Sequence, residues 1–209
     1  IGINKAARTT CVKPAGTTSL VLGTSSGIHA WHNDFYIRRL RVGKNESIYR
    51  YLKQNNPELV QDEYFRPHDT AVIEIPQSAP KGSILRTESA FDLLKRVKQV
   101  ATEWVKPGHR KGSNTHNVSA TISLKANEWD KAGEWMWNNR ECYNGLSVLP
   151  YDGGSYTQAP FEDITKTEFN KRVKLLNDVD LSSITEETDE TDLSGELACA
   201  GGSCEITGL

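Results

Sequence analysis

Two cysteines near the end of the printed sequence, Cys199 and Cys204, are separated by Ala-Gly-Gly-Ser. The glycines permit the tight turn that would close a ring between the two sulfurs. Such a dithiol can attack another disulfide and then be reduced again by an external thiol. The alternatives are two unrelated surface thiols or part of a zinc site, although residues 178–209 hold no further cysteine or histidine to complete four zinc ligands. The favoured chemistry is thiol–disulfide exchange.

The segment that precedes this pair, residues 178–196, contains eight acidic residues and no lysine or arginine. It has no hydrophobic periodicity and cannot bury enough apolar surface to offset the entropy of ordering the chain. Repulsion between its carboxylates would keep it extended. We therefore predict a folded domain over residues 1–177, followed by a flexible acidic tail over residues 178–209 that carries the dithiol.

A second stretch with chemical potential is the sequence Pro-Ala-Gly-Thr-Thr-Ser near the beginning of the chain. The proline and glycine favour a turn, and a helix beginning there would direct backbone N–H groups and its positive dipole end toward an anion. The spacing is not that of a Walker loop, and an ordinary strand–turn–helix corner is the alternative. The candidate phosphate-binding residues are Pro14, Ala15, Gly16, Thr17, Thr18 and Ser19.

A third stretch, residues 143–162, interleaves four aromatic residues with glycine and proline. Such a loop can hold a ligand, but core packing is the expected role of most of these rings. The rings belong to Tyr143, Tyr151, Tyr156 and Phe161.

The remaining cysteines and histidines are expected to be structural. Cys11 and Cys142 are isolated, and isolated cysteines are commonly buried and inert. His29 and His32 lie three residues apart, a spacing that favours a hydrogen-bonded structural pair over a metal site. No metal site is predicted, and the basic loop over residues 106–116 is expected to be solvated.

The elements that must position these residues alternate along the chain between strand and helix patterns, which favours an α/β fold. The expected strands cover residues 9–12, 35–42, 70–76, 117–124 and 145–151; the expected helices cover residues 17–23, 45–57, 88–105 and 127–139, with a further helix after Thr165.

Several residues mark the faces and ends of these elements. One helix face is expected to contain Leu94, Val97, Ala101, Trp104 and Val105; one strand face is expected to contain Val118, Ala120, Ile122 and Leu124. Asn127 is a plausible N-cap, Thr165 and Glu168 match a capping box, and Pro76 is expected to end its strand.

Composition excludes several classes of protein. The 209 residues are 25% charged and 37% hydrophobic, and the net charge of −2 provides no bulk attraction to nucleic acid or anionic membranes. No apolar run is long enough to span a bilayer, and four cysteines are too few for a secreted disulfide framework. We expect a cytoplasmic protein with no nucleic-acid or membrane partner. The chain begins at Ile1 and its single methionine is Met136, so we expect a C-terminal fragment or a processed product.

Taken together, four stretches resemble the C-terminal part of adenosylcobalamin-dependent (class II) ribonucleotide reductases. They are TTCVKPAGTTSLVLGTSSGIH, YIRRLRV, YNGLSVLPYDGGSYTQAPFE and the terminal CAGGSC. The resemblance implies the C-terminal part of a ten-stranded α/β barrel and the reduction of ribonucleotides through a protein thiyl radical. It also implies adenosylcobalamin as cofactor, a ribonucleotide substrate and a reductant of the thioredoxin or glutaredoxin type.

The resemblance assigns roles to the two motifs. Residues 14–19 would bind the substrate phosphates, and Cys199 with Cys204 would reduce the active-site disulfide again after turnover. The radical-bearing cysteine would lie upstream, in a missing N-terminal portion of the enzyme, so the fragment alone is expected to be inactive.

Two alternatives remain at this stage. The oxygen-dependent class of reductases also ends in such a cysteine pair, but it relays a radical through adjacent tyrosines, and no two of the seven tyrosines here are adjacent. The chain could also be a non-catalytic nucleotide-binding or redox-carrier module.

Overall fold

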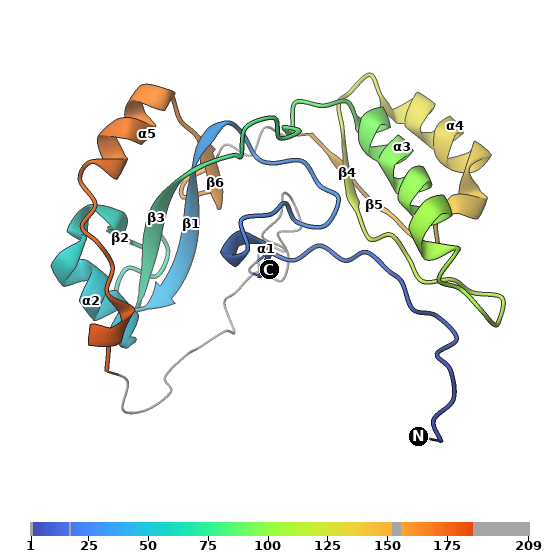
Figure 1. The fold of residues 1–209 in the computed structure, drawn as a ribbon. Coiled ribbons are helices and arrows are strands. Elements are labelled where there is room, and N and C mark those ends of the chain that lie inside the picture. Colours follow the sequence, from blue (N-terminus) through green and yellow to red (C-terminus); the bar gives the residue numbers. More distant parts are fainter. Residues whose placement is uncertain (1, 17, 152–155, 186–209) are drawn as a thin grey trace. The chain divides into compact units, whose positions relative to one another are not determined.

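The computed structural model describes residues 2–16, 18–151 and 156–185, and of Leu20 and Val21 it describes the backbone alone. These residues form two compact units, drawn in Figure 1. The first unit contains the described residues within Ile1–Trp31 and Ser83–Asp152, and the second contains those within His32–Gly82 and Gly153–Leu197.

The first unit is built around a parallel pair of strands and the helices that cover it (Figure 1). Strand β4 pairs with β5 in parallel, with Thr121 opposite Ser147, and helix α4 makes the crossover that a parallel pair requires. Its elements are α1 (Thr18–Val21), α3 (Ala90–Val100), a π-helix (Ala101–Val105), β4 (Thr121–Leu124), α4 (Trp129–Asn138), a 3-10 helix (Arg140–Cys142) and β5 (Ser147–Pro150).

The core of this unit confirms most of the predicted faces. The alternating residues of the expected strand are all buried: Val118, Ala120, Ile122 and Leu124. Four of the five residues expected on the helix face are also buried: Leu94, Val97, Ala101 and Val105.

The prediction for Trp104 was wrong, because its side chain is 54% exposed. The helix widens into a π turn over Ala101–Val105, where the N–H of Lys106 donates to the carbonyl of Ala101 at 2.9 Å. A π turn rotates each residue by less than an α turn does, so Trp104 leaves the buried face.

The starts of helices α3 and α4 have local causes. Ser89 caps α3, with a complete capping box in which Asp92 is the third helical residue. For α4 the predicted cap was wrong: Glu128, not Asn127, occupies the N-cap position. The Glu128 side chain accepts a hydrogen bond from the N–H of Lys125 at 2.9 Å, which closes a turn ahead of the helix.

The strand expected over residues 9–12 is reduced to two isolated bridges. Arg8 pairs antiparallel with His109, whereas Val12 pairs in parallel with Val118. Because the two partners lie on different segments and run in opposite senses, no continuous ladder forms.

The second unit is an antiparallel sheet with strand order β2-β3-β1-β6, accompanied by helices α2 and α5 (Figure 1). Its buried core includes Leu52, Leu59, Val60, Ala71 and Ile73. Its elements are β1 (Phe35–Gly43), α2 (Ser47–Asn55), a 3-10 helix (Pro57–Leu59), β2 (Val60–Asp62), β3 (Thr70–Ser78), β6 (Phe161–Asp163), α5 (Lys166–Val173) and a 3-10 helix (Leu181–Ser183).

The ends of two elements test the sequence predictions further. Strand β3 runs two residues beyond Pro76, because β2 pairs with Ala71–Ile73 alone and leaves no strand there that needs the missing N–H. Helix α5 begins as predicted, since the Thr165 side chain accepts from the N–H of Glu168 at 3.1 Å.

The fold class is therefore mixed α/β, as predicted. That residues 1–177 form the C-terminal part of a ten-stranded barrel, and that the tail is flexible, remain predictions; residues 186–209 lie outside the described residues. Within the described part of the chain, no helix combines the length and apolar character needed to cross a bilayer.

Candidate functional site

The 14–19 turn follows directly after the bridge between Val12 and Val118. The N–H of Ser119 donates to the carbonyl of Val12 at 2.9 Å, and the N–H of Val12 donates to the carbonyl of Asn117 at 3.4 Å. The segment therefore runs alongside the chain that enters β4. The turn then leads into the short helix α1, so the predicted turn and helix are present, while the strand expected before them is reduced to isolated bridges.

Hydrogen bonds within the turn give its hydroxyl groups different roles. Ser19 is 6% exposed, and its hydroxyl donates to the carbonyl of Ala15. Because the Ser19 hydroxyl proton is used in this bond, which holds the turn together, it is not available to a ligand. Thr18, in contrast, is exposed to solvent. Pro14, Ala15 and Gly16 are half-buried, and Thr17 lies outside the described residues.

Gly27 packs against the beginning of the turn. Its φ of +59° lies in the left-handed region that side chains disfavour. A Cβ atom on Gly27 would lie 3.2 Å from the carbonyl oxygen of Lys13 and 3.3 Å from Cα of Pro14. Both neighbours are backbone atoms, so the close approach fixes the position of Pro14.

His29 anchors the loop that contains Gly27 to the start of β4. Its Nε2 accepts from the N–H of Thr121 at 2.9 Å, which leaves the proton on Nδ1 to donate to the carbonyl of Ser26 at 2.8 Å. This bonding confirms the structural role predicted for His29.

A partly buried ion pair supports the same loop from the side of helix α3. Arg96 donates to the carbonyl of Ile28 at 3.0 Å and to both carboxylate oxygens of Glu88, at 3.1 and 2.6 Å. Sequence reasoning missed Gly27, Arg96 and Glu88. The only sequence signal for this loop was the glycine in Gly27-Ile28-His29, because a glycine can adopt the left-handed backbone that the loop needs.

The aromatic residues of the third motif have separate environments. Burial raises the pKa of Tyr143, whose hydroxyl donates to the carbonyl of Met136 at 2.9 Å. In the second unit, Phe161 stacks on His32 at 4.8 Å and lies beneath the guanidinium of Arg38 at 4.4 Å. These two rings pack as predicted, whereas Tyr151 and Tyr156 are exposed.

The cysteines give a mixed result. Cys11 and Cys142 are both free thiols; Cys11 is exposed and Cys142 is half-buried. The burial on which their structural interpretation rested is therefore absent for Cys11. Cys199 and Cys204 lie outside the described residues, so their role stays a prediction.

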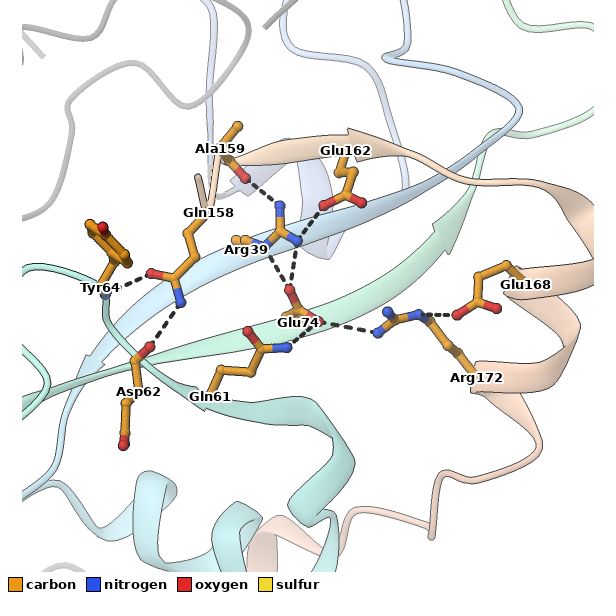
Figure 2. A network of polar contacts seen from close by, with 10 residues as sticks. All are labelled: Arg39, Gln61, Asp62, Tyr64, Glu74, Gln158, Ala159, Glu162, Glu168 and Arg172. Carbon is orange, nitrogen blue, oxygen red and sulfur yellow. Dashed lines mark hydrogen bonds and ion pairs between the residues drawn. The ribbon is translucent and has the colours of Figure 1, made fainter. Parts of the chain in front are cut away.

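Figure 2 shows a buried polar network in the second unit, centred on Glu74. Glu74 is 2% exposed and accepts from Arg39 Nε at 2.7 Å, and from Gln61 and Arg172 at 3.1 Å each. Burial lowers the pKa of Arg39, but hydrogen bonds to Glu162 and Glu74 raise it overall. Because its charges are paired and hydrogen-bonded, this network joins β1, β2, β3 and β6 to α5 and has a structural role.

The second unit also contains a pocket of about 740 Å³ at one end of the antiparallel pair β1–β3. Its cations are already paired, since Lys44 donates to Asp62 at 2.5 Å and Arg66 to Asp69 at 2.8 Å. The lining residues are Arg41, Val42, Gly43, Lys44, Asn45, Glu63, Phe65, Arg66, His68, Asp69 and Thr70.

The structure is similar to a crystal structure of a B12-dependent (class II) ribonucleotide reductase, with a TM-score of 0.63 and 25% identity. The match covers 79% of this chain and 22% of that chain.

Curated relatives agree with the structural match. The chain is 29% identical over 209 residues to the adenosylcobalamin-dependent ribonucleoside-triphosphate reductase of Lactobacillus acidophilus, and 28% identical over 213 residues to that of Euglena gracilis. These matches cover 99% and 97% of this chain but 27% of each relative. No family model matches the chain. The predicted resemblance to adenosylcobalamin-dependent ribonucleotide reductases is thus confirmed in sequence and in fold.

Proposed function

We propose that this chain forms part of an adenosylcobalamin-dependent reductase that converts ribonucleoside triphosphates to deoxyribonucleotides. The observation that carries the proposal is the similarity along 99% of the chain to relatives with that activity in their names. The chain spans 27% of the length of the first of these relatives. In this proposal the radical-bearing cysteine belongs to another part of the enzyme, and these residues alone are inactive.

In this proposal the 14–19 turn binds the substrate phosphates. Its backbone N–H groups and the accessible hydroxyl of Thr18 donate to the anion, while Ser19 holds the turn through Ala15. The support for this role is the rigid packing of Gly27 against Pro14, which keeps the donors in place before substrate arrives.

Cys199 and Cys204 supply the two electrons for each further turnover. A thiolate of the pair attacks the active-site disulfide, one S–S bond breaks, and a mixed disulfide forms. The second thiolate then attacks that mixed disulfide, which releases the active-site dithiol and leaves the pair oxidised. A protein dithiol of the thioredoxin or glutaredoxin type reduces the pair by the same exchange.

The pocket of the second unit does not suit the cofactor that the relatives' names imply. A corrin presents a broad apolar face, whereas Val42 and Phe65 are the only large apolar residues that line the pocket of the second unit. No described residue is therefore assigned to adenosylcobalamin, and no step is derived through it.

The test uses the complete reductase that contains this chain. Reduction of a ribonucleoside triphosphate should require adenosylcobalamin and no di-iron subunit. In the Cys204→Ser variant, a single turnover should remain while repeated turnover with a thioredoxin system stops. A small dithiol such as dithiothreitol should restore repeated turnover, because it reduces the active-site disulfide directly.

Cys142→Ser is the matched control, since it removes a half-buried thiol with no proposed redox role. It should leave repeated turnover unchanged. Turnover without adenosylcobalamin would overturn the proposed activity, and normal thioredoxin-dependent turnover of Cys204→Ser would overturn the role of the dithiol.

A further inference from the structure

Two basic segments of the first unit, distant in sequence, are held side by side. The N–H of Thr9 donates to the carbonyl of Gly108 at 3.0 Å, and the N–H of Arg110 donates to the carbonyl of Ala7 at 2.8 Å. Arg8 and His109 form an antiparallel bridge between these bonds. The folded chain therefore joins residues 5–11 and 104–111 into one surface.

Close packing makes this junction rigid. A Cβ atom on Gly108 would lie 1.9 Å from Oγ1 of Thr10, so no other residue fits there without displacing the neighbouring segment. The same Thr10 hydroxyl donates to the carbonyl of Trp104 at 2.8 Å. The indole N–H of Trp104 donates to the carbonyl of Cys11 at 3.4 Å.

The joined segments form a basic face, which we define by five cations and one aromatic residue. Neither residues 1–33 nor residues 104–127 contain any aspartate or glutamate. Among the described residues, none of the five cations forms an ion pair with a carboxylate, and four of them are exposed; Arg8 is half-buried. The members of the basic face are Lys5, Arg8, Lys106, Arg110, Lys111 and the half-exposed Trp104.

The basic face lies away from the 14–19 turn. Pro14 lies six positions after Arg8, and six residues at the rise of a strand span about 20 Å. A large partner on this face would therefore leave the turn accessible to substrate.

We propose that the basic face docks a partner protein through a carboxylate-rich surface, with Trp104 as its apolar anchor. An exposed tryptophan beside arginine is typical of the residues that dominate protein interfaces, and the lysines add positive charge that attracts carboxylates. A net charge of −2 and the acidic segment over residues 178–196 disfavour a nucleic acid as the occupant. If the proposed function holds, on which this identification rests, the partner is the protein reductant of the dithiol.

The test compares two triple variants of the complete reductase, assayed with thioredoxin, its reductase and NADPH. Lys106→Gln/Arg110→Gln/Lys111→Gln should raise the KM for thioredoxin about tenfold, the factor that three exposed ion pairs of ordinary strength supply together. The KM of the wild type should rise with ionic strength, and that of the variant should rise much less. The rate with dithiothreitol should not change.

The matched control removes three exposed lysines elsewhere in the first unit, as Lys95→Gln/Lys125→Gln/Lys131→Gln. Its KM for thioredoxin should stay within twofold of the wild type. Equal KM values for the two triple variants would overturn the proposal. It would also be overturned if the basic-face triple variant lost binding to a single-stranded DNA oligonucleotide while its KM for thioredoxin stayed unchanged.

Trp104→Ala tests the apolar anchor separately from the charges. It should raise the KM for thioredoxin severalfold, whereas Trp137→Ala, which removes an exposed tryptophan from α4, should not. Failure of the proposed function is distinguishable, because Cys204→Ser would then turn over normally with thioredoxin. A working dithiol with an unchanged KM in Trp104→Ala and in the basic-face triple variant would refute the docking surface alone.

Discussion

Gly27→Ala should weaken nucleotide binding without touching the nucleotide. The new Cβ would lie 3.2 Å from the carbonyl oxygen of Lys13 and 3.3 Å from Cα of Pro14, closer than ordinary van der Waals contact. Gly23→Ala is a matched control, because Gly23 has nearly the same φ, +63° against +59°, but no atom lies within 4 Å of its Cβ position.

Both variants introduce backbone strain, but only Gly27→Ala also introduces a close contact with Lys13 and Pro14. Left-handed backbone strain should lower the free energy of unfolding by roughly 1–2 kcal/mol in both. In Gly27→Ala the contact must also displace Pro14 by a few tenths of an ångström. That shift should weaken a charge-assisted hydrogen bond to phosphate by about 1 kcal/mol, which corresponds to about fivefold in affinity.

The assay is substrate binding to the complete reductase, measured together with thermal unfolding. The dissociation constant should rise about fivefold in Gly27→Ala and stay near the wild-type value in Gly23→Ala. Equal affinities in the two variants would refute the argument that Gly27 positions the 14–19 turn, whatever their stabilities.

Three further predictions concern the turn, the buried network and a helix cap. Gly16→Val in the complete reductase should weaken nucleotide binding far more than it lowers the melting temperature; unchanged affinity in a binding titration would remove the 14–19 turn from the substrate site. Glu74→Gln should destabilise the protein by about 3 kcal/mol in urea unfolding, because it leaves Arg39 and Arg172 partly uncompensated in a buried network; a loss below about 0.5 kcal/mol would contradict that role. Hydrogen bonds from Ser89 hold the pKa of Asp92 below its usual range, so its contribution to stability is present above the unfolded pKa and is lost as the pH falls through the folded value. Asp92→Asn should therefore be less stable than the wild type at neutral pH, with the difference closing in acid; a pH-independent difference would contradict the carboxylate's role.

The sequence by itself determined the local elements of this protein. Alternation from Val118 to Leu124 predicted a buried strand face, and helical spacing from Leu94 to Val105 predicted the face of α3. Both patterns arise within one element, where the period of the backbone decides which side chains share a face. The motif at residues 14–19 was visible for the same reason, since turn residues act through their own dihedral angles.

The tertiary structure alone decided which distant segments meet. Nothing local indicated that Arg8 would pair with His109, that Gly27 would pack on Pro14, or that Glu74 would join Arg39 to Arg172. The expected strand at residues 9–12 failed because a strand needs a continuous partner, and its two partners lie on different segments. Trp104 was misplaced because the π turn that exposes it is closed by a backbone bond that side-chain periodicity does not encode.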